Sequence, residues 1–366
     1  MNILRVSTFP TIKKSGMGLH SYYLCNMKDS YTYFLTPLDE DVRLVVPGNT
    51  MLIEKYFTRK VRPREKNKLA QFFFQIGRVL SIIRFSLDGA KILFSKRIDV
   101  VHIHSPMYSM IAVLGWLLRK QVYITFHGSD FYRIKGSSVY RMFSFIYDGV
   151  FVISPDMIPY LAEVHGDDKI HQVENGIDSI VYVNKSVTRK KQIIGVGALK
   201  EEKGFNCLID SFSLFLIAAP YAHEYKLVIV GEGLLRNTLQ KQINDNGLSN
   251  FVSLVGHKTV NELVDLYNES EIFVLSSISE GFPKVLLEAI SCGCKIVSTK
   301  VGSVPEILSN YEYLVDVCNN DDLANKIVSI SQLKYVFFSN YYLEIKNRYE
   351  WDKVRETYES IYKACQ

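Results

Sequence analysis

The feature of this chain that most constrains its fold is the alternation of short apolar runs with longer amphipathic segments. Continuous apolar runs of strand length are typical of parallel strands that are buried on both faces of a sheet. The predicted strands form two series: 2–7, 42–46, 100–104, 122–127, 150–154 and 170–173, then 192–196, 226–230, 251–255, 272–275, 295–298 and 313–315. Helical periodicity separates most of them, so the chain is predicted to be an α/β protein with two helix-covered parallel sheets.

The length of the chain supports two domains. Its 366 residues exceed what a single hydrophobic core usually organises. Residues 178–190 have little apolar periodicity and are the predicted linker between a domain at 1–177 and a domain at 191–366. The chain ends in an amphipathic helix whose apolar face must be buried, either on its own domain or back on the first: Trp351, Val354, Tyr358, Ile361 and Tyr362.

The composition excludes several classes of protein. With 48% hydrophobic and 22% charged residues, the chain is neither disordered nor fibrous. The six cysteines are scattered without a C-x-x-C pair, which argues against a disulfide scaffold or a structural zinc site. An apolar strand begins directly after Met1, and the apolar stretch at 107–118 is shorter than the ~20 residues a membrane span needs. We therefore expect a cytoplasmic protein.

The most informative string runs from Ser279 to Ala289, S-E-G-F-P-K-V-L-L-E-A. It follows a predicted strand and opens a helix, and Pro283 suits the first helical turn. Amides at the start of a helix form a site for anions such as a diphosphate. Glu280 before the helix and Glu288 within it could accept hydrogen bonds from sugar and ribose hydroxyls, although each acid taken alone is more typical of a solvated surface.

A second string, from Val196 to Gly204, also follows a strand and precedes a helix. Lys203 could reach a diphosphate, although a solvated lysine is the commoner outcome for one residue. The glycines Gly195 and Gly197 lack the third glycine of a dinucleotide fingerprint, so a nicotinamide cofactor is excluded.

Two weaker strings end other predicted strands. Gly16 and Gly18 in S-G-M-G would let the backbone approach a ligand closely, or could belong to a flexible loop. His127 in T-F-H-G-S-D lies where a parallel sheet presents residues to ligands, and a histidine satisfied within the fold is the alternative.

Taken together and in this order, the strings resemble the family-4 retaining glycosyltransferases, also called glycosyl transferases group 1. The E-x7-E string that contains Gly-Phe-Pro carries most of the resemblance. Three further landmarks lie at residues 175–178 (N-G-I-D), 231–233 (G-E-G) and 302–306 (G-S-V-P-E). The resemblance covers nearly the whole chain and implies the GT-B fold, in which two Rossmann-like domains face each other across a cleft.

The resemblance also implies a role for each matching residue. His127, Lys203 and Glu280 would act at the transferred sugar and the diphosphate, Glu288 would bind the ribose, and the backbone near Gly256 would frame the base. The implied donor-binding set is Gly16, Gly18, Gly197, Lys203, Gly256, Glu280, Gly281, Phe282, Pro283, Lys284, Val285, Leu286 and Glu288.

The chain departs from the family pattern at Ala198, where members often carry an arginine. One cation that would face the diphosphate is then missing, and a hydrogen bond to a charged group contributes roughly 1.5–3 kcal/mol. Our hypothesis is that Lys284, in the first turn of the phosphate-facing helix, supplies this charge.

The family resemblance implies transfer with retention of configuration. We expect front-face displacement, in which the protein acts through positioning and electrostatic stabilisation. No metal or other cofactor is expected. Asp39-Glu40-Asp41 resembles a D-x-D metal motif only in its letters, because it precedes a predicted strand and is typical of a turn.

The positive charge is concentrated in one segment. Residues 55–97 contain twelve Lys and Arg against two acids, a charge of +10, whereas the whole chain carries +5. Within it Leu69, Phe72, Phe73, Ile76, Leu80 and Ile83 recur at helical spacing, and we expect this face to pack on the sheet. The cations on its flank favour an anionic membrane surface or a lipid-linked acceptor. Solvated cations are the alternative, and no nucleic-acid-binding module is present.

These observations predict a retaining glycosyltransferase at the inner face of the cell membrane. It would move a hexose or N-acetylhexosamine from a nucleotide-diphosphate sugar to a lipid-linked glycan in the synthesis of a surface polysaccharide such as O-antigen or capsule. UDP is favoured as the nucleotide, and a GDP-mannose type donor is the alternative. A sugar-nucleotide epimerase and a catalytically silent GT-B protein remain open, the latter because of Ala198.

Overall fold

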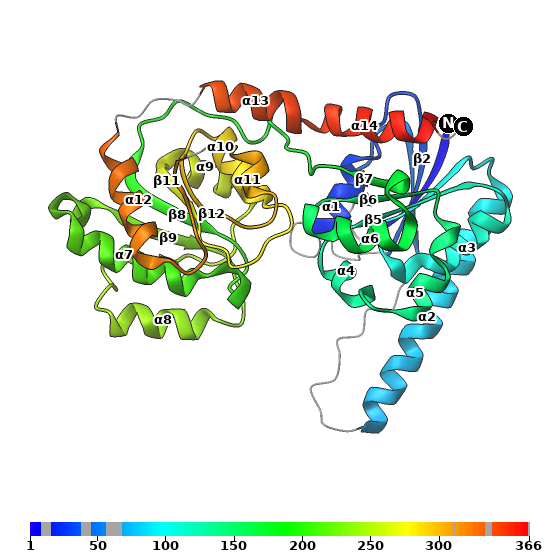
Figure 1. Cartoon of the computed structure of the whole chain (residues 1–366), viewed down its shortest axis with the longest axis horizontal. Coiled ribbons are helices and arrows are strands. Elements are labelled where there is room, and N and C mark those ends of the chain that lie inside the picture. Colours follow the sequence, from blue (N-terminus) through cyan, green and yellow to red (C-terminus); the bar gives the residue numbers. More distant parts are fainter. Residues whose placement is uncertain (9–15, 38–44, 56–67, 310–311, 334–338, 365–366) are drawn as a thin grey trace. The chain divides into compact units, whose positions relative to one another are not determined.

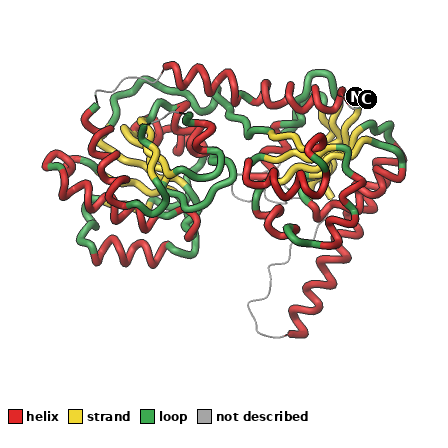
Figure 2. Tube along the Cα trace, in the orientation of Figure 1, coloured by secondary structure: helices red, strands yellow, loops and turns green. Residues whose placement is uncertain are grey.

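The computed structural model describes residues 1–8, 16–37, 45–55, 68–309, 312–333 and 339–364. The chain divides into two compact units: Met1–Asn175 with Trp351–Gln366, and Gly176–Glu350. In each unit a parallel sheet is enclosed by helices (Figure 2). The α/β class and the two parallel sheets predicted from the sequence are therefore confirmed.

The first unit contains a seven-stranded parallel sheet (Figure 1). Its strands lie in the order β3-β2-β1-β4-β5-β6-β7. The strands are β1 (Asn2–Val6), β2 (Tyr31–Pro37), β3 (Thr50–Lys55), β4 (Val100–Ile103), β5 (Gln121–Phe126), β6 (Gly149–Val152) and β7 (Ile170–Gln172). Its helices are α1 (Gly16–Tyr23), α2 (Lys68–Ser95), α3 (Ser109–Leu117), α4 (Ser129–Ile134), α5 (Ser138–Met142), α6 (Ile158–His165) and α14 (Trp351–Ala364).

The second unit contains a six-stranded parallel sheet in the order β10-β9-β8-β11-β12-β13. The strands are β8 (Lys190–Val196), β9 (Lys226–Val230), β10 (Val252–Leu254), β11 (Ser270–Leu275), β12 (Lys295–Thr299) and β13 (Leu314–Val315). Its helices are α7 (Phe205–Ala218), α8 (Arg236–Asp245), α9 (Val260–Glu269), α10 (Lys284–Ser291), α11 (Val304–Ile307), α12 (Asn320–Gln332) and α13 (Ser339–Tyr349). Helix α9 begins with a capping box between Thr259 and Glu262, a pairing that satisfies two otherwise unbonded amides.

The terminal helix α14 belongs to the first unit, one of the two destinations that its amphipathic pattern allowed. Its buried face joins the core of that unit through Trp351, Val354, Tyr358 and Tyr362. The division of the chain consequently differs from the predicted domains, because residues 351–366 leave the predicted second domain and residues 178–190 lie within the second unit.

One predicted strand is wrong in the described residues. Val45 and Val46 of the predicted strand at 42–46 are not in a strand, and residues 42–44 lie outside the described residues. The sheet is instead extended by β2 and β3, which the prediction missed. Strand β2 is the sequence Y-T-Y-F-L-T-P, whose threonines and tyrosines interrupt the continuous apolar run by which the other strands were predicted.

Candidate functional site

Each sheet has a switch point, where neighbouring strands lead to connections on opposite sides. Ligands of parallel α/β sheets bind beyond the carboxyl ends of the strands at such points. In the second unit the switch point lies between β8 and β11, which pair directly. The two most informative sequence strings follow these two strands, so the fold brings both strings to one edge of the sheet.

Lys203 and Glu280 form an ion pair at this edge. The ammonium of Lys203, in the turn after β8, contacts Oε1 of Glu280, in the loop after β11. The hydroxyl of Ser277 donates to the same oxygen at 2.7 Å. Both charged side chains are largely buried, with 25% and 9% of their surface exposed, so the pair is only partly screened by water.

Close backbone contacts fix the two loops that carry this pair. Gly204 has φ +58°, and a Cβ there would lie 2.1 Å from the carbonyl oxygen of Ser276. Gly302, at φ +49°, approaches the carbonyl of Glu280 closely enough that a Cβ would lie at 2.3 Å. Only glycine fits both positions, which gives a physical reason for the glycine of the 302–306 landmark.

The start of α10 differs in detail from the prediction. Pro283 caps the helix and precedes its first residue, Lys284, whereas the prediction placed the proline within the first turn. The amide of Leu286 donates to the carbonyl of Pro283 at 3.0 Å, and the side chain of Leu286 is buried, so its donor contact stays a prediction. Phe282, Lys284 and Val285 remain candidates for anion binding at this end of the helix.

Glu288 lies one turn beyond Lys284 on the same face of α10. Its Oε2 accepts a hydrogen bond from the hydroxyl of Tyr267 at 3.1 Å. Burial raises the pKa of Glu288, whereas the hydrogen bond from Tyr267, the charge of Lys284 and the hydrogen bond from Tyr182 act in the opposite direction. For Lys284, burial disfavours the charged form in the same way and lowers the pKa to about 8, and the charge of Glu288 opposes this shift.

The predicted glycines of the second unit lie around the same edge. The amide of Gly197 donates to the carbonyl of Val230 at 3.0 Å, and the carbonyl of Gly256 accepts from Gly231 at 2.9 Å. Ala198, where family members often carry arginine, is exposed. The loop after β8 therefore carries a small, exposed side chain at the position that departs from the family pattern.

In the first unit the switch point lies between β1 and β4. His127 directly follows the neighbouring strand β5 and is half-buried. Gly16 and Gly18 were predicted in a loop over the phosphates but lie in the first turn of α1. Residues 9–15, which precede them, lie outside the described residues, as does the Asp39–Asp41 stretch.

A network of buried polar side chains surrounds this switch point, and the sequence analysis missed it. Arg5 on β1 contacts the rings of His102 and His104 at 3.0 and 3.1 Å, and all three residues are fully buried. His104 in turn contacts His127 at 3.2 Å. The only sequence signal for this network is a polar residue at alternate positions of otherwise apolar strand ends, as in H-I-H.

Asp130 holds the backbone that carries His127. Its Oδ1 accepts from the amides of His127 and Phe131 at 2.9 and 3.1 Å. Burial is the largest influence on this carboxyl and raises its pKa to about 6, against the opposing backbone hydrogen bonds.

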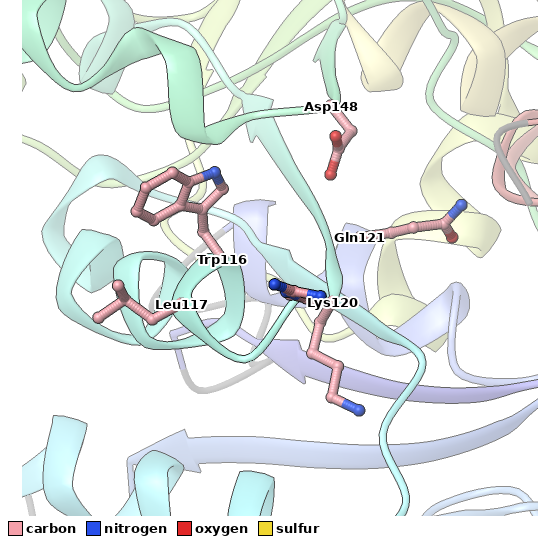
Figure 3. A pocket seen from close by; sticks show the side chains of 6 residues that line it. Trp116, Leu117, Lys120, Gln121 and Asp148 are labelled. Carbon is pink, nitrogen blue, oxygen red and sulfur yellow. The ribbon is translucent and has the colours of Figure 1, made fainter.

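A cavity of about 470 Å³ in the first unit lies away from this edge. Figure 3 shows it lined by Trp116, Leu117, Lys120, Gln121 and Asp148. Because Gln121 begins β5 and Asp148 directly precedes β6, this cavity is at the amino ends of the strands, opposite to the edge where ligands of such sheets bind.

Helix α2 lies within the basic segment, of which residues 56–67 lie outside the described residues. The predicted packing of its apolar face is wrong. Ile76, Leu80 and Ile83 are exposed, with 40%, 60% and 37% of their surface accessible. The helix instead packs through its opposite face, where Phe85 and Ile92 are buried. The side chains of Leu69, Phe72 and Phe73 lie outside the described ones. No helix in the described ranges is both long enough and apolar enough to span a membrane.

Comparisons with known proteins agree with this arrangement. The family model described as Glycosyl transferases group 1 matches residues 178–341, and that described as Glycosyltransferase Family 4 matches residues 35–179. An uncharacterized glycosyltransferase of Methanocaldococcus jannaschii, MJ1178, is 27% identical over 291 residues, which cover 75% of this chain and 78% of that protein. The gpi3 subunit of phosphatidylinositol N-acetylglucosaminyltransferase from Schizosaccharomyces pombe is 29% identical over 46% of this chain, but only 37% of its own length is matched.

Two solved structures share the fold. Sucrose-phosphate synthase from Thermosynechococcus elongatus superimposes with a TM-score of 0.75 at 17% identity, covering 100% of this chain and 98% of that one. Anabaena Alr3699/HepE in complex with UDP and glucose gives a TM-score of 0.71 at 15% identity, covering 98% of each chain.

Proposed function

Because this chain belongs to the group 1 glycosyltransferases and has their GT-B fold, we propose that it transfers a hexose or N-acetylhexosamine from a nucleotide-diphosphate sugar, with retention, to a lipid-linked glycan. The observation that carries the proposal is the Lys203–Glu280 pair beside the first turn of α10, at the switch point of the second sheet. At this edge Lys203 and the first amides of α10 could bind the diphosphate, and Glu280 could accept hydrogen bonds from the sugar hydroxyls.

In the proposed reaction the acceptor hydroxyl attacks the anomeric carbon on the face from which the diphosphate leaves. Lys203 and the start of α10 stabilise the charge that develops on the leaving phosphate. A phosphate oxygen takes the proton of the attacking hydroxyl, so no protein base is assigned to this step. Glu280 accepts from hydroxyls of the transferred sugar and Glu288 from the ribose. We propose that His127 contacts the sugar and that no metal is needed.

UDP is the favoured nucleotide. One structural neighbour was solved with UDP and glucose, and one relative is named for N-acetylglucosaminyl transfer to phosphatidylinositol. The first supports a UDP-sugar, and the second supports an N-acetylhexosamine and a lipid acceptor. A GDP-mannose type donor is the alternative.

A thermal-shift screen with UDP, GDP, ADP and their sugars tests the donor site. A ligand that binds the native state raises the unfolding midpoint by mass action. We expect a shift with UDP and its sugars that is lost in Glu288→Ala. Glu269→Ala is the matched control, since Glu269 is a half-exposed acid of the same unit that pairs with Lys190. No shift with any nucleotide would contradict the proposal.

We also propose that the exposed face of α2 binds an anionic membrane surface, close to the lipid-linked acceptor. Six large apolar side chains share this face and are between 37% and 72% exposed: Ile76, Val79, Leu80, Ile83, Leu87 and Phe94. They recur at helical spacing over five turns. An apolar stripe of this length is more than the scattered exposed residues of an ordinary surface.

The charges beside this α2 apolar face favour lipid over a second copy of the chain. Arg84 and Lys91 flank it and are exposed, whereas Asp88, the only acid of the helix, is 15% exposed and pairs with Lys91. A symmetric dimer through this face would bring like charges together. Cations beside an apolar stripe match anionic headgroups above acyl chains.

Flotation with phosphatidylglycerol and phosphatidylcholine vesicles tests the membrane proposal. We expect the protein to float with the anionic vesicles at low salt and Leu80→Glu/Leu87→Glu to float several-fold less. Leu234→Glu is the control, because Leu234 is 92% exposed in the second unit. Equal flotation of the double variant and the native protein would contradict a role for α2, as would a native protein that binds neither vesicle.

The place of the reaction in surface polysaccharide assembly, at the inner face of the membrane, is part of the same proposal. A sugar-nucleotide epimerase would change the donor with no acceptor present. A silent GT-B protein, which Ala198 favours, would bind the donor without turnover. Product analysis with and without a lipid-linked acceptor separates the three functions.

A further inference from the structure

Three buried or half-buried side chains of the first unit are connected in a row that ends at the candidate site. Nη1 of Arg5 lies 3.1 Å from Nε2 of His104. Nδ1 of His104 lies 3.2 Å from Nε2 of His127. In the described part of the chain no carboxylate forms an ion pair with Arg5, and the contacts of its Nη1 and Nη2 are with histidine rings and the sulfur of Met27.

The direction of these hydrogen bonds follows from the chemistry of arginine. A guanidinium only donates, so Nε2 of His104 must accept from Arg5. A neutral imidazole that accepts at one nitrogen carries its proton on the other, so His104 bears the proton on Nδ1. That N–H points to His127, whose Nε2 must therefore accept, which leaves the proton of His127 on Nδ1.

We propose that Arg5, acting through His104, holds His127 as the neutral tautomer protonated on Nδ1. His127 then offers an N–H at Nδ1, and its Nε2 is occupied by His104 and is not available as a general base. Arg5 and His104 are positioning residues. The proposal deepens the assigned role of His127 and rests on the proposed function only for the statement that the ligand is a sugar hydroxyl.

The same row excludes a charged His127. An imidazolium would need both of its nitrogens to donate, and His104 would then have to accept at Nδ1 while also accepting from Arg5 at Nε2. A neutral ring cannot do both, and burial lowers the pKa of His104 well below its ordinary value. Among the described residues, the titratable groups that face His127 include His20 and Asp130. The ring of His20 lies edge-on at 5.0 Å, and the carboxyl of Asp130 accepts from the backbone amide of His127.

A side branch of the network offers a matched control. The same Nη1 of Arg5 lies 3.0 Å from Nδ1 of His102, and Nε2 of His102 lies 2.7 Å from the hydroxyl of Thr125. His102 is as buried as His104 and shares its cation, and the rings of the two stack at 4.3 Å. The hydrogen bonds of His102 lead away from His127, so its loss should leave the tautomer of His127 unchanged.

The test is a long-range ¹H–¹⁵N correlation spectrum of the histidine-labelled full chain between about pH 5 and 8, with His127 assigned from the His127→Gln spectrum. In the native protein we expect a protonated Nδ1, an unprotonated Nε2 and no titration over this range. In His104→Phe, which keeps a ring but loses the donor, we expect His127 to titrate and to populate the Nε2–H form. In His102→Phe we expect the native pattern.

The native spectrum decides the proposal even where a variant fails to fold. A proton on Nε2 of His127, or an imidazolium at pH 7, would overturn it, as would an unchanged His127 in a folded His104→Phe variant. Arg5→Gln is a second variant, since an amide can donate or accept and no longer forces the direction. These results are independent of donor binding, so a failure of the proposed function would appear in the thermal-shift screen and not in this spectrum.

Discussion

The two units compensate their buried positive charge in different ways. In the second unit Lys203 contacts Glu280, and Lys284 lies near Glu288, so each cation at the switch point has an acid beside it. In the first unit Arg5 contacts two histidines, and in the described residues it has no acid partner. One switch point is thus built from opposite charges and the other from one charge and neutral rings.

This difference separates two tasks. An ion pair can be redistributed when an anion arrives, because a diphosphate competes with the carboxylate for the same ammonium. A guanidinium surrounded by neutral rings has nothing to exchange, and its fixed donors determine where the protons lie. The second unit is therefore suited to accept a charged leaving group, and the first to present groups whose protonation does not change.

The largest effect is expected from the exchangeable pair. Lys203→Ala should lower kcat for sugar transfer by roughly 10²–10³-fold, the usual cost of removing one preorganised group that stabilises transition-state charge. Initial rates with a saturating donor measure it. Lys200→Ala is the matched control, an exposed lysine of the same loop. Equal rates for Lys203→Ala and the native enzyme would remove the ion pair from the mechanism.

Asp130 tests whether the first unit disfavours negative charge near His127. The folded-state pKa of about 6 lies above the ordinary value for aspartate, so its stabilising contribution is complete at low pH and is lost as the pH rises through 6. Asp130→Asn cannot ionise, so the variant should gain stability relative to the native protein between pH 4 and 7, by up to about 3 kcal/mol. Denaturant unfolding at a series of pH values measures this, and a difference independent of pH would contradict it.

How much the sequence could predict differs between the same two regions. The donor strings of the second unit are local: glycines, a proline and two acids follow strands in one continuous stretch, and the fold brings the stretches together. The network of the first unit is not local. The strand register that places Arg5 opposite His102 and the return of α14 to this unit are tertiary facts that no short pattern contains.

Helix α2 shows why a correct periodicity can still give the wrong face. The spacing of Ile76, Leu80 and Ile83 is helical, as predicted, but the helix is apolar on both sides. Its inner side packs on α3, where a Cβ at Gly89 would lie 2.7 Å from Ile111. Periodicity identifies a stripe and cannot determine which of two stripes is buried.

A smaller effect, on donor affinity, is expected when Glu288 loses its charge. It tests whether Glu288 binds the ribose. Glu288→Gln keeps the shape and the contact with Tyr267 but loses the charge, so donor affinity should fall roughly tenfold, as expected when a charged hydrogen bond becomes a neutral one. Calorimetry with UDP measures the loss. A 2′-deoxy nucleotide provides the control, because it should bind the native protein and the variant more equally. An identical loss with both nucleotides would mean that Glu288 acts elsewhere.

The smallest effect on donor binding is expected at Lys284. It tests whether Lys284 supplies the positive charge that is missing at Ala198. With a pKa of about 8 in the free protein, this side chain is only partly charged at pH 8, and a bound diphosphate would favour its protonated form. Donor binding at pH 8 should therefore take up a fraction of a proton, and the uptake should vanish near pH 6.5, where Lys284 is already charged. Calorimetry in buffers of different ionisation enthalpy measures the uptake directly.

In Lys284→Met we expect no proton uptake and a donor affinity reduced several-fold. The control is Lys300→Met, which removes an exposed lysine of the same unit that pairs with Asp316 and should keep both the uptake and the affinity. If Lys284→Met binds the donor as tightly as the native protein and takes up the same fraction of a proton, the charge missing at Ala198 is not supplied by this helix. The second unit would then hold the diphosphate with Lys203 and backbone amides, and its contrast with the first unit would rest on one exchangeable pair.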